Sequence, residues 1–504
     1  MTEYSLKLKQ RKKNFKKKTN REDSIQKRTK TLFTNSSNKR EQLLLQKRKT
    51  WLQNKILVNE QNFSVFEIQK LVQEIFEGNQ NQKINSLKMI KTLCLKIKPP
   101  YKQLFSNGID IALSFILKNS QHEYILIEAL YVLNHLTIGN IEQTELLYQS
   151  NIIEVLIQLI SNNKNPEIIK SSLLCLGNIL SDSTKYCKDF LKKKYLNIVM
   201  KLFFTNISME IIQAGVWVLL NICPIIPESN KFDITSLLRI FNVLLGSSNE
   251  KIFKDSCFGI KKLARSSKIV NYLFEEGTIS TILSTVKGQT LSSQMRHYLL
   301  LALGQIIKIA SFDQLLLLMK LQIFQNLHHL FLFHFDSIFG EALIKIMVLF
   351  CKRGNIFIQT ILHSELITIL FVKLKEKKTI LDYGMKLQLI KLFNFWYSKT
   401  DLINALLLSK QGAIFFLSQS LLKNDEIDLL LPTLICVLKI IKYKNQQLNN
   451  LLENNGIFQL VEKNIQHPNN DIQTIAINII NKWKKVEKNF EKTNEIELET
   501  LDYF

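Results

Sequence analysis

Glycine and proline are scarce in this chain of 504 residues, which has 15 glycines and 7 prolines. Many short strands joined by tight turns would need more of both residues, so the composition argues against a mainly β structure. Apolar residues make up 46% of the chain, which is enough for a substantial core. We therefore expect an all-α protein, whose length fits either about three domains or one long repeat array.

Paired cysteines and long apolar runs are also missing. The seven cysteines are scattered, contain no CxxC pair and are odd in number, which argues against a disulfide framework or a zinc module and favours a reducing compartment. No apolar run reaches the roughly 18 residues of a membrane helix, and the opening sequence MTEYSLKLKQRKKNFKKK has no apolar segment typical of a secretory signal. We expect a soluble protein without membrane insertion.

Recognisable catalytic motifs are absent. The chain has no GxxxxGK[ST], GxSxG or HExxH sequence. His328, His329 and His334 lie close together in sequence but have no cysteine or carboxylate at ligand spacing. We predict a protein that is not an enzyme, with no catalytic residues, no metal site and no cofactor.

Positive charge is concentrated at the N-terminus. The whole chain has 67 Lys and Arg against 43 Asp and Glu, a net charge of +24, and residues 1–50 hold +13 of it. Dense charge with few apolar anchors predicts a flexible arm that folds when a partner neutralises it. Taken alone, such an arm also fits nonspecific binding to nucleic acid.

A helical repeat begins at about residue 59. Apolar residues recur at i, i+3, i+4 and i+7 over stretches of 10–16 residues, separated by short breaks such as SNNKNP and GSSNE. Seven helical segments align at spacings of 41 to 46 residues, with one column formed by Tyr131, Leu174, Trp217, Phe258, Leu301, Ile344 and Ile390. This period is typical of armadillo and HEAT repeats. About ten repeats are predicted, whose third helices would line a concave surface suited to an extended peptide.

A second column follows four residues later, one helical turn along the same face. Its members are His135, Asn178, Asn221, Lys262, Gln305, Val348 and Asn394. The segment AGVWVLLNIC, with Trp217 and Asn221, resembles the armadillo repeats of importin alpha, the adaptor for nuclear localisation signals. The basic segments RKKNFKKK and KREQLLLQKRK resemble that family's importin-beta-binding segment, and LLENNGIFQLVEKNIQHPNNDIQTIAINIINKW resembles its closing repeat. The resemblance covers essentially the whole chain and implies a right-handed superhelical armadillo solenoid with a basic arm.

The two columns have a chemical rationale as a peptide-binding ladder. Asparagine amides can donate to and accept from the backbone of an extended peptide, and tryptophan rings can hold the aliphatic stems of lysines and attract their ammonium groups. The resemblance further implies a selective lysine pocket made by Asp182, the carbonyl of Gly139 and the hydroxyl of Thr144. The predicted major cargo-signal site comprises Tyr131, His135, Gly139, Thr144, Leu174, Asn178, Asp182, Trp217 and Asn221.

A second, minor site would follow further along the chain. Its column positions have no tryptophan and one asparagine, and Lys262 could repel a basic peptide. We therefore expect a weakened or lost minor site that disfavours two-part signals. Besides Ile344 and Val348, its positions are Phe258, Lys262, Leu301, Gln305, Ile390 and Asn394.

The resemblance divides the chain into three parts. Residues 1–58 would form the importin-beta-binding arm, residues 59–486 the solenoid and residues 487–504 an acidic, disordered tail. The triplet Lys47, Arg48 and Lys49 resembles a localisation signal, and tethering would let it occupy the groove when importin beta is absent. The arm residues assigned to binding and autoinhibition are Arg11, Lys12, Lys13, Phe15, Lys16, Arg28, Lys39, Arg40, Leu44, Lys47, Arg48 and Lys49.

The partners that the resemblance implies are importin beta, cargo proteins with basic localisation signals and a Ran-dependent exportin for recycling. The protein would shuttle between cytoplasm and nucleus, with no small-molecule substrate and no direct contact with nucleic acid. One alternative stays open because several tryptophan and asparagine positions are lost. The chain could be an armadillo scaffold for another partner, with the basic arm as an electrostatic tether.

Overall fold

The computed structural model describes residues 65–96, 99–228, 231–288, 291–334, 337–376, 383–422 and 427–501. Every regular element in these ranges is a helix, which confirms the all-α prediction. The residues assigned to the basic arm lie outside the described ranges. The chain divides into two compact units, Met1–Leu263 (unit 1) and Ala264–Phe504 (unit 2).

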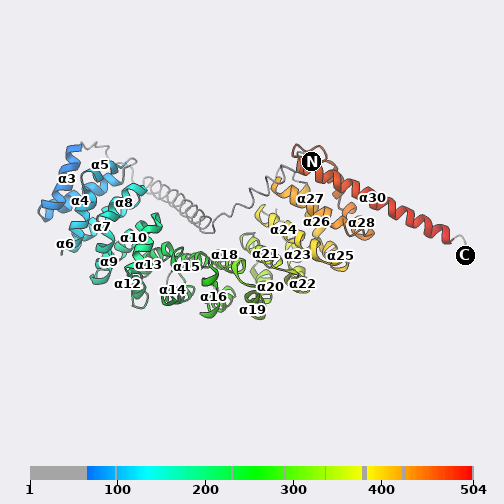
Figure 1. The fold of residues 1–504 in the computed structure, drawn as a ribbon, viewed down its shortest axis with the longest axis horizontal. Helices are drawn as coiled ribbons and strands as arrows, with labels where there is room; N and C mark the ends of the chain where they lie inside the picture. Colours follow the sequence, from blue (N-terminus) through cyan, green and yellow to red (C-terminus); the bar gives the residue numbers. More distant parts are fainter. Residues whose placement is uncertain are drawn as a thin grey trace, which may run out of the picture. The chain divides into compact units, whose positions relative to one another are not determined.

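Unit 1 is a stack of armadillo repeats, each ending in a long third helix. The third helices α4, α7, α10, α13 and α15 pack against one another in that order, and α6, α9, α12 and α14 form the adjoining layer (Figure 1). The elements are α3 (Val65–Glu77), α4 (Gln80–Cys94), α5 (Tyr101–Ser106), α6 (Ile109–Asn119), α7 (Glu123–Leu136), α8 (Ile141–Gln149), α9 (Ile152–Asn162), α10 (Pro166–Asp182), α11 (Thr184–Lys192), α12 (Tyr195–Leu202), α13 (Met209–Ile222), the 3₁₀ turn η1 (Ile226–Glu228), α14 (Lys231–Leu244) and α15 (Glu250–Leu263).

Unit 2 repeats the same plan. Its third helices α18, α21, α24, α27 and α30 pack in succession (Figure 1). The elements are α16 (Ser267–Glu275), α17 (Thr278–Val286), α18 (Ser293–Ile309), α19 (Phe312–Lys320), α20 (Ile323–His334), α21 (Ser337–Cys351), α22 (Asn355–Leu362), α23 (Leu366–Glu376), α24 (Tyr383–Lys399), α25 (Leu402–Gln411), α26 (Ala413–Leu421), α27 (Ile427–Ile441), α28 (Gln446–Asn454), α29 (Ile457–Glu462) and α30 (Asn470–Leu501). Over the described ranges the two units hold about ten repeats, as predicted.

The turn between the first and second helices recurs with a left-handed residue. Gly108, Gly277 and Gly456 adopt φ values of 67° to 77° there, while Lys194 and Gln322 adopt φ of 59° at equivalent turns. A left-handed conformation costs about 1–2 kcal/mol for a residue with a side chain. The repeat therefore sets the backbone even where the sequence supplies no glycine, which is why few glycines suffice for so many turns.

The core is apolar and continuous within each unit. All seven cysteines are free and buried, and Trp396 is among the largest fully buried side chains. In the described part of the chain no single helix is long and apolar enough to span a membrane, although two bent helix pairs pass by length and composition.

The C-terminal tail differs from the prediction. Helix α30 continues through Leu501, whereas we expected a disordered segment from residue 487. The sequence from 487 to 501 contains no glycine or proline and is rich in glutamate and lysine, which are good helix formers. Acidic charge and missing apolar periodicity were therefore insufficient grounds for predicting a break in the helix.

Candidate functional site

The third helices of unit 1 present a stripe of partly exposed side chains. Tyr131 on α7, Leu174 on α10 and Trp217 on α13 are half-buried, whereas the residues on either side of each, such as Leu130 and Val132, are fully buried in the core. Because α7, α10 and α13 pack side by side, these three predicted column residues share one face. We call the exposed side of α7, α10 and α13 the acidic face, for the charges described below.

Trp217 and Asn178 are in direct contact across the boundary between two repeats. The indole Nε1 of Trp217 donates to Oδ1 of Asn178 at 3.2 Å. The Nδ2 of Asn178 in turn donates to Oδ1 of Asn134 at 3.0 Å and to Oγ1 of Thr137 at 3.2 Å. A single polar chain therefore links α13 to α10 and α10 to the end of α7, and it fixes the orientation of the indole.

Asn221 is less exposed than the ladder model assumes. Its side chain is 5% exposed, and its Nδ2 donates to the carbonyl oxygens of Gly177 at 2.9 Å and Trp217 at 3.0 Å. Both amide hydrogens are used within the helix stack, which leaves Oδ1 as the atom through which this amide could receive a peptide N–H. His135, two repeats earlier, is half-buried, and its backbone carbonyl accepts from the hydroxyl of Tyr101 at 3.2 Å.

The structure brings together two members of the predicted lysine pocket. Thr144 on α8 is fully buried, and its hydroxyl donates to Oδ2 of Asp182 at 2.7 Å. Asp182 is the last residue of α10 and is half-buried. Gly139 lies in the turn between α7 and α8, where the side chain of Gln143 fills the position that a Cβ would take. The turn after α7 therefore positions both Gly139 and Thr144 from one repeat, while Asp182 comes from the next.

A row of glutamates was not predicted from the sequence. Glu123, Glu167 and Glu210 lie in the first turns of α7, α10 and α13, at spacings of 44 and 43 residues. The repeat spacing that revealed the two columns would also have revealed these carboxylates. With Asp182 and the buried Glu128, they place five carboxylates on α7, α10 and α13, which makes the acidic face negative.

Hydrogen bonds keep part of this row ionised. Lys170 lies 2.5 Å from Glu167 and 2.9 Å from Glu210, and the hydroxyl of Tyr131 donates to Glu167 at 3.0 Å. Burial works to raise the pKa of Glu167, but the hydrogen bonds from Lys170 and Tyr131 outweigh it and hold that pKa below its usual range. The carboxylate therefore carries its charge at neutral pH.

The ring of Tyr131 already holds an ammonium group from its own chain. The Nζ of Lys91 on α4 lies 4.3 Å from the ring centroid and 3.1 Å from Oε2 of Glu128. Burial raises the pKa of the Tyr131 phenol, and its hydrogen bond to Glu167 raises it further. An aromatic ring beside carboxylates can thus bind a lysine at this end of the acidic face, and Lys91 shows the arrangement.

The predicted minor site falls on both units, and part of its register is wrong. Ile344, Val348 and Ile390 are 0%, 2% and 2% exposed. The partly exposed stripe of α21 and α24 instead passes through Lys345 and Lys391, one residue later. The repeat that ends with α21 is one residue longer than a fixed step of 43 allows, so the error enters at α21 and persists in α24.

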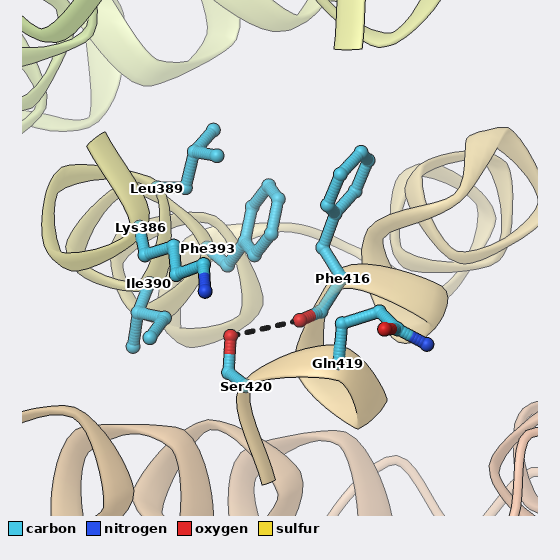
Figure 2. Close-up of a pocket in the computed structure, with 7 residues that line it drawn as sticks. All are labelled: Lys386, Leu389, Ile390, Phe393, Phe416, Gln419 and Ser420. Carbon is cyan, nitrogen blue, oxygen red and sulfur yellow. Dashed lines mark hydrogen bonds between the residues drawn. The ribbon is translucent and has the colours of Figure 1, made fainter. Parts of the chain in front are cut away.

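Figure 2 shows where Ile390 points. It lines a small hollow between α24 and α26, with Lys386, Leu389 and Phe393 on α24 and Phe416, Gln419 and Ser420 on α26. The Ser420 hydroxyl donates to the carbonyl of Phe416 at 2.9 Å. With a volume of about 20 Å³, the hollow has room for one water molecule. Ile390 is therefore a core residue and does not belong to a peptide-binding column.

The other predicted minor-site residues include side chains that bind neighbouring backbone. Lys262 Nζ donates to the carbonyl of Leu220 near the end of α13 at 2.9 Å, and Gln305 Nε2 donates to the carbonyl of Ala264 at 3.3 Å. Asn394 Nδ2 donates to the carbonyls of Ile390 and Pro432 at 3.1 and 2.8 Å. Phe258 and Leu301 are half-buried. Lys262, which we expected to repel a basic peptide, thus has its ammonium group bound at the end of α13.

Comparison with known proteins supports the repeat assignment. The model of the Armadillo/beta-catenin-like repeat family matches residues 140–181, the segment that runs from the cap of α8 to the last turn of α10. The crystal structure of an engineered protein superposes with a TM-score of 0.65 over 84% of this chain and 99% of its own, at 15% identity. This chain therefore has an armadillo-repeat fold.

The curated relatives are distant and match part of the chain. Importin subunit alpha-1b of Oryza sativa subsp. japonica is 21% identical over 34% of this chain and 32% of its own length. Probable importin subunit alpha-A of Dictyostelium discoideum is 24% identical over 50% of this chain and 52% of its own length. The chain thus spans between about a third and a half of these relatives. The similarity supports a repeat scaffold for binding other proteins.

Proposed function

We propose that this protein is a nuclear import adaptor. The acidic face of α7, α10 and α13 would bind Lys/Arg-rich nuclear localisation signals of cargo, and residues 1–58 would bind importin beta. Three observations support the proposal: the names of the distant relatives, the carboxylates on the acidic face, and the +13 charge of the first 50 residues. An adaptor acts by binding alone, which agrees with a repeat scaffold.

The contact between Thr144 and Asp182 carries the proposal. A buried hydroxyl from one repeat orients a half-exposed carboxylate at the end of the next, so the pocket depends on two repeats being stacked. A carboxylate accepts several hydrogen bonds, and a lysine ammonium placed there would form a charge-assisted bond worth about 1.5–3 kcal/mol. Trp217, oriented by Asn178, would pack against the stem of a neighbouring lysine.

The remaining roles follow the same proposal. The major site would comprise the nine residues predicted from the sequence, with Asn221 contributing its Oδ1. The Lys47 to Lys49 triplet would compete for the acidic face until importin beta binds the arm, and a Ran-dependent exportin would return the free adaptor to the cytoplasm. The minor site would contribute little to two-part signals because Ile390 is buried and Lys262 is engaged at α13.

Replacement of Asp182 tests the lysine pocket. Asp182→Lys in the full chain should weaken binding of a labelled, single-cluster Lys-rich peptide at least tenfold in fluorescence anisotropy, because it reverses the charge that selects the ammonium. Asp182→Asn should weaken binding less, because the amide oxygen can still accept from Thr144. Glu453→Lys, an equal charge change at an exposed residue of α28, should leave the affinity unchanged. Equal affinities for Asp182→Lys and the unmodified chain would refute the pocket.

A further inference from the structure

The third helices of unit 2 present a face of opposite charge. Along the exposed sides of α21, α24 and α27, the carboxylates within the described ranges are Glu341 and Asp428, whereas lysines occur on all three helices. We call this surface the basic face. Its lysines are Lys345, Lys391, Lys399, Lys439 and Lys442, the last directly after α27.

Several of these lysines are unpaired in the part of the chain that the structure describes. Lys345 and Lys442 are exposed and Lys391 is half-buried, and none of the three forms an ion pair among the described residues. Lys439 donates to the carbonyl of Asn394 at 2.9 Å. On the acidic face, by contrast, Lys170 lies between two glutamates. The basic face thus carries positive charge that no ion pair among the described residues of unit 2 neutralises at Lys345, Lys391 or Lys442.

The carboxylate of Glu341 does not neutralise the lysines at the centre of the basic face. Its Oε2 lies 2.5 Å from where a Cβ of Gly384 would be, so the absence of a side chain at Gly384 makes room for the carboxylate at the start of α24. A negative group near the first turn of a helix is favourable. Glu341 therefore packs against the N-terminal end of α24.

Apolar side chains lie between the lysines. Leu349 on α21, Phe395 on α24, and Ile435 and Leu438 on α27 are half-buried on the same stripes. Apolar groups next to like charges suit a partner that offers both carboxylates and apolar side chains. They suit a nucleic acid less well, because its binding rests mainly on many contacts between cationic residues and phosphates.

We propose that the basic face binds an acidic segment of a partner protein in an extended conformation across α21, α24 and α27. Packed helices lie about 8–10 Å apart, and an extended chain advances about 3.3 Å per residue. The segment would therefore carry Asp or Glu at about every third position, with apolar residues between them. This proposal is independent of cargo-signal binding, because it concerns unit 2 and a peptide of opposite charge.

Fluorescence anisotropy on the full chain tests the proposal. The probe is a labelled peptide of about twelve residues with Glu at every third position and Leu or Phe between, compared with the same peptide carrying Lys in place of Glu. We expect the Glu peptide to bind and Lys391→Glu to weaken it at least tenfold. Lys410→Glu, the same change at an exposed residue of α25, should leave the affinity unchanged. Equal loss in both variants, or none in either, would overturn the assignment.

Two further measurements distinguish an acidic peptide from other ligands of the basic face. Phe395→Ala should weaken the Glu peptide about threefold, whereas a single-stranded oligonucleotide should compete poorly. An oligonucleotide that competes as well as unlabelled peptide, together with no effect of Phe395→Ala, would assign the face to nucleic acid and overturn the proposal.

A chain that ends at residue 487 lacks the acidic sequence EIELETLDYF. Much tighter binding by that chain would make its own terminus the occupant and overturn the assignment to a separate partner.

Discussion

At the scale of single residues, the geometry of the acidic face depends on one close approach. Gly177 lies directly under the indole of Trp217, so that a Cβ at this position would overlap the ring. The two columns of the sequence predict that Asn178 and Trp217 share one face. The sequence does not show that Gly177 makes the contact between Asn178 and Trp217 possible, because the ring comes from a position 40 residues later in the chain.

Gly177→Ala should therefore displace the indole. We expect a loss of about 1–3 kcal/mol in the free energy of unfolding, typical of overpacking, and weaker binding of a Lys-rich peptide. Urea unfolding and fluorescence anisotropy measure the two effects.

Gly304→Ala is the matched control. Gly304 precedes Gln305 on α18 as Gly177 precedes Asn178, and its nearest neighbour, Leu349 Cδ1, would lie an ordinary 3.5 Å from the new Cβ. An alanine in a helix interior favours stability by about 0.5–1 kcal/mol over glycine. If both glycines tolerate alanine equally well, the indole does not depend on the space at Gly177.

At the scale of elements, successive third helices are joined by a side chain that donates to a backbone carbonyl. Asn221 on α13 binds the carbonyl of Gly177 on α10, Lys262 on α15 binds that of Leu220 on α13, and Lys439 on α27 binds that of Asn394 on α24. The donor changes from amide to ammonium, but the link remains. The lost asparagines of the second column are thus replaced, at least at Lys262, by a residue with the same structural task.

Lys262→Met should remove this link while keeping most of the apolar stem. We expect a loss of about 1 kcal/mol in the free energy of unfolding, because a carbonyl near the end of α13 loses its donor. Lys251→Met, at an exposed residue in the first turn of the same helix, provides the comparison. Identical denaturant midpoints for the two variants would mean that the hydrogen bond from Lys262 to the carbonyl of Leu220 does not contribute to the free energy of unfolding.

Helices and repeat number were predictable from apolar periodicity, because each third helix buries one face against its neighbours. The register was predictable only while the repeat length stayed constant, as the shift from Ile344 to Lys345 shows. Loop lengths respond to packing in three dimensions, which a fixed spacing cannot represent. The left-handed turns at Lys194 and Gln322 were also hidden, since neither residue type signals that conformation.

At the scale of the whole molecule, the net charge does not show that the acidic face and the basic face carry opposite charges. The exposed side of α7, α10 and α13 carries carboxylates from Glu123 to Glu210, whereas that of α21, α24 and α27 carries lysines. The +11 that remains beyond residue 50 therefore does not describe either surface. Only the assignment of each residue to an exposed stripe or to the core separates the two, and that assignment needs the structure.

Deletion of residues 1–55 tests the role proposed for the arm. Removal of a tethered competitor should raise the affinity for a Lys-rich peptide, and the shortened chain should no longer bind importin beta. Anisotropy titrations and a pull-down with purified importin beta measure these effects. Retention of importin beta by the shortened chain would place its binding site elsewhere.

The links between the third helices of unit 1 also have a direction. Asn221 and Lys262 each donate to a carbonyl of the preceding third helix, whereas in unit 2 Lys439 on α27 and Asn394 on α24 donate in opposite directions. Loss of a later repeat would remove the donors to the carbonyls of Gly177 and Leu220, while loss of an earlier repeat would leave a side chain that water readily solvates. Within unit 1, fraying and proteolytic trimming should therefore advance more easily from the C-terminal side than from the N-terminal side.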